Sequence, residues 1–288
     1  MDAYLARAEK VLAQGRRRKE LRVPRPLKIS LIILLFLGFI AIFGPRLAPY
    51  GVNEMTDELL VSPRPGHWFG TDDIGRDIFT MVLYGARTSL LVGIVAALIS
   101  MFIGTSLGAV AGYYGGKLDR FLNELINIFL MLPTFFLIIM VVAIFGSSMA
   151  KVTLVIGLTS WMGTAKLMNA QTKSLKERTF VKAGQVLGER DQSILFRYIV
   201  PHGIFPVLAN VSQSVSSAIL FEASLSFLGL GDPNVMSWGQ IIYLGKAFMG
   251  RGWWVAAFGG LAIIITMFAF HLLAEGLNQI LQPQAGGR

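Results

Sequence analysis

The stretch TFVKAGQVLGERDQSILFRYIVP, residues 179–201, decides how the rest of this chain is interpreted. Apolar residues recur in its first half at the spacing of a helix: Phe180, Val181, Gly184 and Leu187. Gly188 is expected to end that helix, Asp191 is a candidate N-cap for a second short helix, and Pro201 is expected to close the unit. The stretch therefore predicts two short amphipathic helices between two long apolar segments.

Two interpretations of this pair of helices remain open on the residues alone. Amphipathic helices beside membrane spans can lie on the lipid surface, with their apolar face in the headgroup region. They can equally be received by a partner protein on the same side of the membrane.

The spacing in this stretch resembles the cytoplasmic-loop signature of ABC importer permeases, which reads Glu-Ala-Ala, three residues, Gly, nine residues, and Ile-x-Leu-Pro. Four positions depart from it: Lys182 for the acid, Gly184 for the second alanine, and Tyr198 and Val200 for Ile and Leu. The resemblance implies that a set of residues contacts ATPase subunits: Phe180, Val181, Lys182, Ala183, Gly184, Leu187, Gly188 and Pro201. With Lys182 in place of the acid, an ion pair that relatives make there would be absent or reversed.

The composition indicates an all-α, polytopic membrane protein with one membrane domain. Of the 288 residues, 54% are hydrophobic and only 15% are charged, and several charge-free runs exceed the roughly 18 residues of a spanning helix. The chain has no cysteine, which excludes disulfides and thiolate metal sites. A net charge of +9 can indicate a protein that binds nucleic acid, so the distribution of the charges along the chain matters.

Six transmembrane helices are predicted: about 29–45, within 88–116, within 125–150, about 152–165, from 201 onward, and about 252–279. Both termini then lie on one side of the membrane. The predicted organisation is a basic segment 1–28, a membrane domain 29–283 with a loop at 166–201, and a short tail 284–288.

The basic residues predict which side is cytoplasmic. Nineteen of the 26 lysines and arginines fall in the N-terminal segment, the 114–123 and 166–201 loops and the C-terminus, and seven fall on the other side. Basic loops stay in the cytoplasm, so both termini are expected there and the 46–87 and 230–251 loops face outward. The charge therefore orients the protein, and no nucleic-acid partner is expected. Segment 1–28 is either a surface helix on anionic lipid or a solvated tail.

A second stretch, HWFGTDDIGRD at 67–77, lies in the expected outer loop. Its three acids lack the alternation and closing Glu of a calcium loop, so no metal is expected there. The stretch resembles the Phe-Gly-Thr-Asp-x-x-Gly-Arg-Asp motif of one permease type in the dipeptide/oligopeptide/nickel importer family. The residues that carry this motif are Phe69, Gly70, Thr71, Asp72, Gly75, Arg76 and Asp77. Stretches at 84–93, 111–116, 222–231 and 237–239 continue the resemblance, which covers about 29–283.

Two features within the predicted spans fit either helix packing or a functional site. Gly104, Gly108 and Gly112 recur every four residues and predict close helix packing, at a subunit interface or within the chain. An acid in a span, here Glu222, is a functional candidate. It lies about 31 Å along a helix from Pro201, which places it near the outer interface. We therefore favour a role in ordering the turn that contains Ser226, Gly229 and Gly231 over a role as substrate ligand.

Candidate enzymatic and metal sites are not supported. His271 and Glu275 share a helix face, but no third ligand is apparent, so a polar helix end is favoured. Gly116 and Lys117 resemble the end of a phosphate-binding loop, which Ala111 and Leu118 then violate. No nucleotide site is expected in this chain, and the energy for any transport must come from another subunit.

The resemblance implies a type I ABC importer permease that forms half of a translocation pore in a bacterial or archaeal cytoplasmic membrane. It implies a second, homologous permease, two ATPase subunits that carry ATP and Mg, and an external binding protein that delivers a peptide or a nickel chelate. An ion-coupled secondary transporter is the alternative, but it needs ionisable groups at the membrane midplane, which the third and fourth spans lack. A membrane enzyme would need catalytic groups facing a wet cavity, and none is readable.

Overall fold

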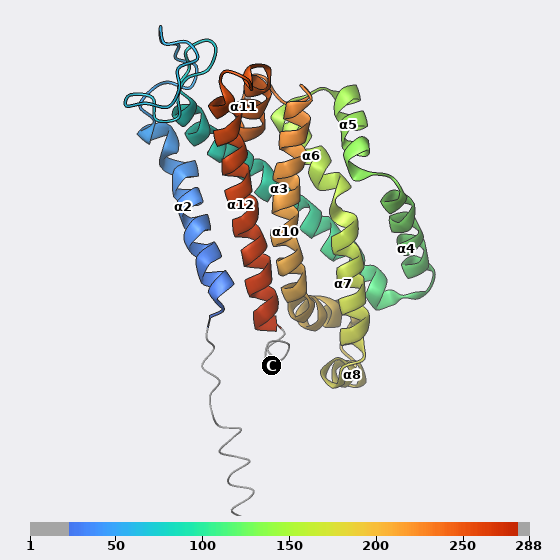
Figure 1. Cartoon of the computed structure of the whole chain (residues 1–288). Helices are drawn as coiled ribbons and strands as arrows, with labels where there is room; N and C mark the ends of the chain where they lie inside the picture. Colours follow the sequence, from blue (N-terminus) through green and yellow to red (C-terminus); the bar gives the residue numbers. More distant parts are fainter. Residues whose placement is uncertain (1–22, 282–288) are drawn as a thin grey trace, which may run out of the picture.

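The computed structural model describes residues 23–281, and every regular element in that range is a helix apart from two isolated bridges in the 48–77 loop (Figure 1). The surface helix considered for segment 1–28 lies almost entirely outside the described residues, and the tail 284–288 lies wholly outside them.

The first half of the fold contains α2 (Arg25–Leu47), α3 (Ile78–Tyr114), α4 (Gly116–Met131), α5 (Thr134–Phe145), α6 (Met149–Thr159) and α7 (Trp161–Lys176). The second half contains α8 (Thr179–Val186), α9 (Asp191–Ser193), the π-helical turn η1 (Ile194–Ile199), α10 (Val200–Phe227), α11 (Trp238–Gly245), the short 3₁₀ turn η2 (Lys246–Phe248) and α12 (Trp253–Leu281).

Four described helices are long and apolar enough to cross a membrane: Arg25–Leu47, Ile78–Tyr114, Asp191–Phe227 and Trp253–Leu281. The pair α4 and α5 is bent by 83° at Leu132 and Pro133, and it supplies a fifth crossing if it is counted as one span. Neither α6 nor α7 reaches the length of a span by itself, because the helix breaks at Ser160. The all-α polytopic fold is confirmed, with four to five candidate spans where six were predicted.

The helices run between two ends of the molecule (Figure 1). Helix α12 packs between α2 and α10, while α3 tilts across the bundle towards α7. The 48–77 loop and α11 lie at one end, which we call the α11 end. Helix α8 and the turn that follows it lie at the opposite end, which we call the α8 end.

The three glycines at every fourth position of α3 lie against α7 of the same chain. A Cβ added at Gly104 would lie 2.7 Å from the carbonyl oxygen of Trp161, and one at Gly112 would lie 2.8 Å from that of Asn169. At Gly108 it would collide with the carbonyl of Ala165. The absence of side chains therefore lets the two backbones approach, which is how helices pack closely in lipid.

The second short helix does not end before the next span, so the prediction that Pro201 closes the unit is wrong. One continuous helix runs over Asp191–Phe227, and Pro201 lies in the first turn of α10. The wide π turn η1 comes directly before it, and the Val200 N–H donates to the carbonyl of Leu195. A proline ring clashes with the carbonyl four residues earlier in an α-helix, and a π turn displaces that carbonyl.

Candidate functional site

The α8 end carries a compact helix pair formed by residues 179–199, which we call the α8–η1 unit. Helix α8 ends in a Schellman motif, in which the Gly188 N–H donates to Gln185 O at 3.0 Å and the Glu189 N–H donates to Gly184 O at 3.1 Å. Gly188 has φ of +75°, a left-handed conformation that favours glycine. It thus turns the chain back on itself, as the sequence predicts.

The interior of the α8–η1 unit is apolar and closed by polar contacts. Val181 and Gly184 are buried, and a Cβ added at Gly184 would lie 3.8 Å from the Ile194 side chain. The Glu189 carboxylate accepts hydrogen bonds from Tyr198 Oη at 2.7 Å and from Ser193 Oγ at 3.2 Å. The two arms are therefore held at a fixed angle by contacts within the chain.

The predicted apolar face of α8 divides into an inward and an outward part. Val181 and Gly184 point inward, whereas Phe180 and Leu187 are exposed, and Leu187 is 79% exposed. Val186 is 87% exposed and Phe196, on η1, is 59% exposed. Lys182, Ala183, Gly188 and Pro201 are also on the surface. Residues 23–281 leave this outward part uncovered. We call its two most exposed residues, Val186 and Leu187, the apolar tip.

Lys182, which stands where the resembling signature has an acid, pairs within its own chain. Its Nζ lies 2.8 Å from Glu177 Oε2, and both side chains are exposed. The hydrogen bond from Lys182 lowers the pKa of the Glu177 carboxyl. Arg178, Arg190 and Arg197 are also exposed. The exposed charges along this stretch of sequence are therefore mostly basic.

Tyr113 at the end of α3 connects the α8–η1 unit to the bundle. Its hydroxyl donates to Asp191 Oδ1 at 2.7 Å, and its carbonyl oxygen accepts from Lys176 Nζ at 2.6 Å. Asp191 makes no N-cap bond and is the first residue of α9, so the predicted N-cap is wrong. The reason is that its carboxylate is turned away from the helix, towards Tyr113. Sequence reasoning missed this link because it joins positions 78 residues apart.

At the α11 end, the acids of the 67–77 motif are structural. Asp72 Oδ2 lies 2.7 Å from both Nε and a terminal guanidinium nitrogen of Arg76, and Asp72 Oδ1 accepts the backbone N–H of Arg76 at 2.8 Å. Asp77 Oδ2 caps α3 by accepting the Thr80 N–H at 2.8 Å. Its Oδ1 lies 2.9 Å from His67 Nδ1. Both carboxylates are buried, and their oxygens are engaged by the chain itself.

The same motif docks the 48–77 loop onto α12. The Phe69 ring stacks on Phe258 with centroids 3.9 Å apart, and Trp254 Nε1–H donates to Thr71 O at 3.1 Å. A Cβ added at Gly70 would lie 2.5 Å from Val61 O, and one at Gly75 would collide with the carbonyl of Thr56. Both glycines have positive φ. The motif thus builds the loop, and residues 23–281 contain no cluster of three side chains suited to a metal.

Glu222 connects α10 to α11. Its Oε1 accepts hydrogen bonds from Ser226 Oγ and Ser237 Oγ, both at 2.7 Å, and the side chain is buried. Gly229 has φ of +82°, and a side chain at Gly231 would collide with Ser226. The carboxylate lies inside the turn that it is expected to order, while its second oxygen, Oε2, is buried and has no hydrogen-bond partner among residues 23–281. The role of Glu222 in ordering this turn stays a prediction.

The histidine and the acid considered on α12 do not form a site. His271 Nδ1 lies 3.4 Å from Gln213 Oε1, whereas Glu275 Oε1 accepts from Gln279 Nε2 at 3.1 Å. Each polar group has its own partner on the same or a neighbouring helix. The arrangement fits a polar helix end.

The fold defines an all-α, polytopic membrane protein. A chain of the MetNI methionine ABC transporter, solved in an inward-facing conformation, superposes with a TM-score of 0.53 at 19% identity. The match covers 69% of the present chain and 96% of that chain. At this identity the match establishes the fold alone.

Sequence relatives define the family. The family described as "Binding-protein-dependent transport system inner membrane component" matches residues 104–286, and "N-terminal TM domain of oligopeptide transport permease C" matches residues 20–63. The dipeptide permease DppC of Bacillus subtilis is 36% identical, with 88% of this chain and 81% of the relative covered. The oligopeptide permease OppC of Escherichia coli K12 is 36% identical (96% and 95% covered), and the glutathione permease GsiD of Pectobacterium atrosepticum is 37% identical (93% and 89% covered).

The chain belongs to the family of binding-protein-dependent transport system inner-membrane components, in its OppC/DppC branch. It is a multi-pass permease subunit of an ABC importer in the inner membrane, and it is not an enzyme. Membership implies partners of two kinds, an ATPase and a solute-binding protein.

Proposed function

We propose that this chain forms half of the translocation pore of an ATP-driven importer of short peptides and receives the movement of the ATPases through its α8–η1 unit. The observation that carries this proposal is that large apolar side chains of the unit are uncovered: Val186 and Leu187 at the end of α8, and Phe196 on η1. The interior of the unit is packed by other side chains, so the exposed apolar side chains do not contribute to the folded core of this chain. Exposed apolar surface marks contact with another protein or with the membrane. The transport family of this chain, which works with an ATPase, supports the first of these.

The topology is part of the proposal: six passes with both termini in the cytoplasm. Helices α4 and α5 together run from the α8 end to the α11 end, and α6 followed by α7 runs back (Figure 1). If each pair is one pass, six passes result. The excess of basic residues in segments 1–28 and 166–201 assigns the α8 end to the cytoplasm. The boundaries proposed for the membrane domain remain 29–283, with the coupling loop at 166–201 and the tail at 284–288.

Coupling would work through apolar contact and charge register. The Leu187 side of α8 would enter a cleft on an ATPase subunit, while Lys182 and the neighbouring arginines would lie at its rim. The exposed charges near α8 are mostly basic, so we expect acidic residues on the ATPase surface that receives α8. In permeases that carry the acid of the signature at the position of Lys182, we expect the ATPase to present basic residues there. The angle fixed at Gly188 and by Glu189 would let the unit move as one rigid body.

The partners are a homologous second permease that completes the pore, two ATPase subunits that bind ATP and Mg, an external binding protein at the α11 end, and the lipid bilayer. Neither a cofactor in this chain nor a nucleic-acid partner is part of the proposal. The solute is proposed to be a peptide because three similar permeases are named for dipeptide, oligopeptide and glutathione transport.

An ion-coupled secondary transporter is the competing function. Such proteins place ionisable side chains at the membrane midplane. Between residues 125 and 165 the one ionisable side chain is Lys151, whose Nζ donates to the Phe145 carbonyl at the α11 end. Midplane chemistry for ion coupling is therefore lacking in this part of the chain.

The test is uptake of labelled di- and tripeptides by proteoliposomes that contain this permease, its second permease, the ATPases and the binding protein. We expect uptake that needs both ATP and the binding protein. Uptake that persists without the ATPases and is abolished by an ionophore would support the secondary transporter. If the proteoliposomes take up another solute in an ATP-dependent way but none of the peptides tested, the importer function stands and the proposed peptide solute is wrong.

A further inference from the structure

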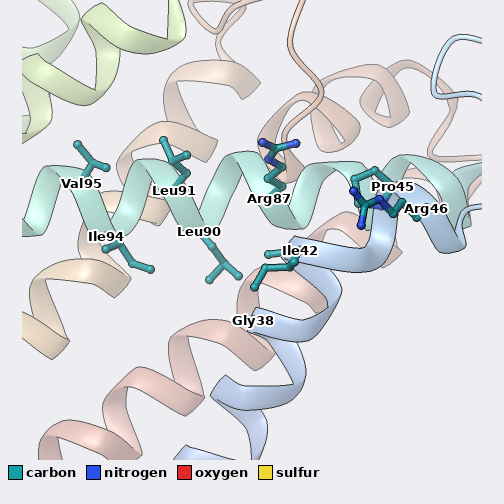
Figure 2. Close-up of a pocket in the computed structure, with 10 residues that line it drawn as sticks. Gly38, Ile42, Pro45, Arg46, Arg87, Leu90, Leu91, Ile94 and Val95 are labelled. Carbon is teal, nitrogen blue, oxygen red and sulfur yellow. The ribbon is translucent and has the colours of Figure 1, made fainter.

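A groove of about 580 Å³ lies between α2 and α3 near the α11 end (Figure 2). Its walls are apolar, with Gly38 and Ile42 on α2 and Leu90, Leu91, Ile94 and Val95 on α3. Figure 2 shows Arg46 and Arg87 towards one end of this groove and Ile94 and Val95 towards the other. The groove therefore combines an apolar channel with a cationic end.

The groove follows from how the two helices cross. They touch near Gly44, where an added Cβ would lie 3.2 Å from Leu83 O, and Tyr84 Oη donates to Pro45 O at 3.5 Å. Below this crossing α3 tilts away from α2 (Figure 1). On the α2 side the groove is open at Gly38, because this residue has no side chain and a Cβ added to it would meet nothing within 4 Å.

The two arginines differ from others at the same end of the molecule. Arg64 pairs with Glu58 and Arg76 pairs with Asp72, whereas Arg46 and Arg87 are exposed and make no ion pair within residues 23–281. Arginines at the edge of the hydrocarbon region extend their guanidinium groups to lipid headgroups, while their stems stay against apolar surface. Their place beside an apolar groove thus fits a ligand with a negative head and a hydrocarbon tail.

We propose that this groove binds an anionic phospholipid of the leaflet on the side of the 48–77 loop. The phosphate would lie on Arg46 and Arg87, and one acyl chain would follow the wall from Leu90 to Val95. The distance from Arg87 to Val95 is about 12 Å along α3. This length is close to the roughly 15 Å of hydrocarbon in one leaflet.

Other occupants fit the walls less well. A peptide would need partners for its backbone N–H and C=O groups, and the α3 wall from Leu90 to Val95 offers only aliphatic side chains. A helix of the second permease would fill the channel but would need its own acids for Arg46 and Arg87. A zwitterionic lipid carries an ammonium group that offsets the phosphate charge, so an anionic headgroup is preferred.

The proposal depends on the membrane location of α2 and α3 and not on the solute or on the α8–η1 unit. It is tested on the purified importer complex, reconstituted with phosphatidylglycerol that carries a photoreactive diazirine on its acyl chain. Labelled peptides of this chain are then located by mass spectrometry. We expect labels on the residues between Leu90 and Val95 of the wild-type protein.

Two variants and one control separate charge from shape. Each arginine near an anionic lipid surface contributes about five-fold in affinity, so Arg46→Gln with Arg87→Gln should reduce labelling roughly 25-fold at limiting lipid. Gly38→Leu should abolish it by filling the channel, and the helix should tolerate the change because a Cβ added at Gly38 meets nothing within 4 Å. Arg251→Gln, an exposed arginine in another loop, should leave it unchanged.

Three results would overturn the proposal: equal labelling of the wild-type protein and the double arginine variant, equal labelling by phosphatidylcholine, or cross-links from Gly38→Cys to the second permease in the assembled complex. Unchanged peptide uptake in the double variant would leave the proposal intact, because it concerns lipid binding. Conversely, lipid labelling as expected in a complex that transports no peptide would overturn the proposed function alone.

Discussion

The two ends of the molecule are held together by different kinds of contact. At the α11 end, the buried carboxylates of Asp72, Asp77 and Glu222 accept hydrogen bonds from their own chain. The α11 end therefore carries a buried polar network made within this subunit, although it also exposes apolar side chains such as Trp68 and Met249. At the α8 end a helix pair held by its own contacts exposes Val186 and Leu187, which is where we propose that an ATPase binds.

Glycines with positive φ show the same contrast. At Gly75 any side chain would collide with the Thr56 carbonyl, whereas a Cβ added at Gly188 would meet nothing within 4 Å. A substitution at Gly75 would therefore break the loop itself. A substitution at Gly188 would strain only the backbone conformation and hence the angle of the α8–η1 unit.

The largest effect is expected for Asp72→Ala at the α11 end. The change leaves the Arg76 guanidinium mostly buried without its counter-charge, which costs about 3–5 kcal/mol of stability. The measurement is thermal unfolding of the purified permease in detergent. Arg64→Gln is the matched control, because its pair with Glu58 is half exposed and should be worth less than about 1 kcal/mol. Equal losses in the two variants would contradict the structural role assigned to the buried pair.

The next effect concerns the helix contact that joins the two ends. Gly108→Leu would force α3 away from the Ala165 carbonyl of α7, at a cost of about 1–3 kcal/mol or more. We expect a lower yield of assembled complex, measured by size-exclusion chromatography after purification. Gly260→Leu on α12 adds the same side chain where an added Cβ has no neighbour within 4 Å. If both variants assemble equally well, the close approach of α3 and α7 is not needed.

At the α8 end, Gly188→Val should act on transport and not on insertion. A β-branched residue with φ near +75° costs about 1–2 kcal/mol, which corresponds to a roughly ten-fold lower population of the docking geometry. We expect normal amounts in the membrane, unchanged solute affinity of the binding protein, and uptake reduced about ten-fold. Gly188→Asn should restore much of the uptake, because asparagine tolerates this conformation. Normal uptake and normally stimulated ATP hydrolysis by Gly188→Val would support the alternative interpretation, in which the α8–η1 unit lies on the lipid surface and does not couple to an ATPase.

The smallest effect is expected for Tyr113→Phe, which removes the hydroxyl that holds Asp191. One hydrogen bond contributes about 1 kcal/mol, so the fold should persist. The loosened link should lower uptake more than it lowers ATP hydrolysis, since the ATPases would move a unit that is less firmly tied to α3. Tyr114→Phe is the control, because that side chain is exposed and its hydroxyl makes no hydrogen bond to residues 23–281. An unchanged ratio of uptake to hydrolysis in Tyr113→Phe would argue against the link.

Periodic and conformational signals in the sequence predicted much of this structure. The long apolar runs gave the helices, and the turn at Gly188 follows from the conformational preference of glycine. The stripe of glycines at every fourth position indicated a close contact, but its partner α7 lies about 60 residues further along the chain, and spacing on one helix does not identify a partner.

The features that could not be predicted from the sequence depend on contacts between residues far apart in the chain. Asp191 reads as an N-cap by its position, but its carboxylate is attracted to Tyr113, which is remote in the chain. Pro201 reads as a boundary, yet a π turn carries the helix through it. The face of α8 also could not be divided in advance, because which apolar residues point inward depends on where η1 packs.

The most direct test of the account measures whether the α8–η1 unit is covered by an ATPase. The chain has no cysteine, so Leu187→Cys supplies a unique thiol on the exposed tip, and Met249→Cys supplies one at the α11 end. Alkylation by a water-soluble maleimide is compared in the two purified permeases and in their complexes with the ATPases. We predict that the ATPases slow alkylation at position 187 at least ten-fold and leave position 249 unchanged. Equal alkylation at position 187 with and without the ATPases would contradict the central claim.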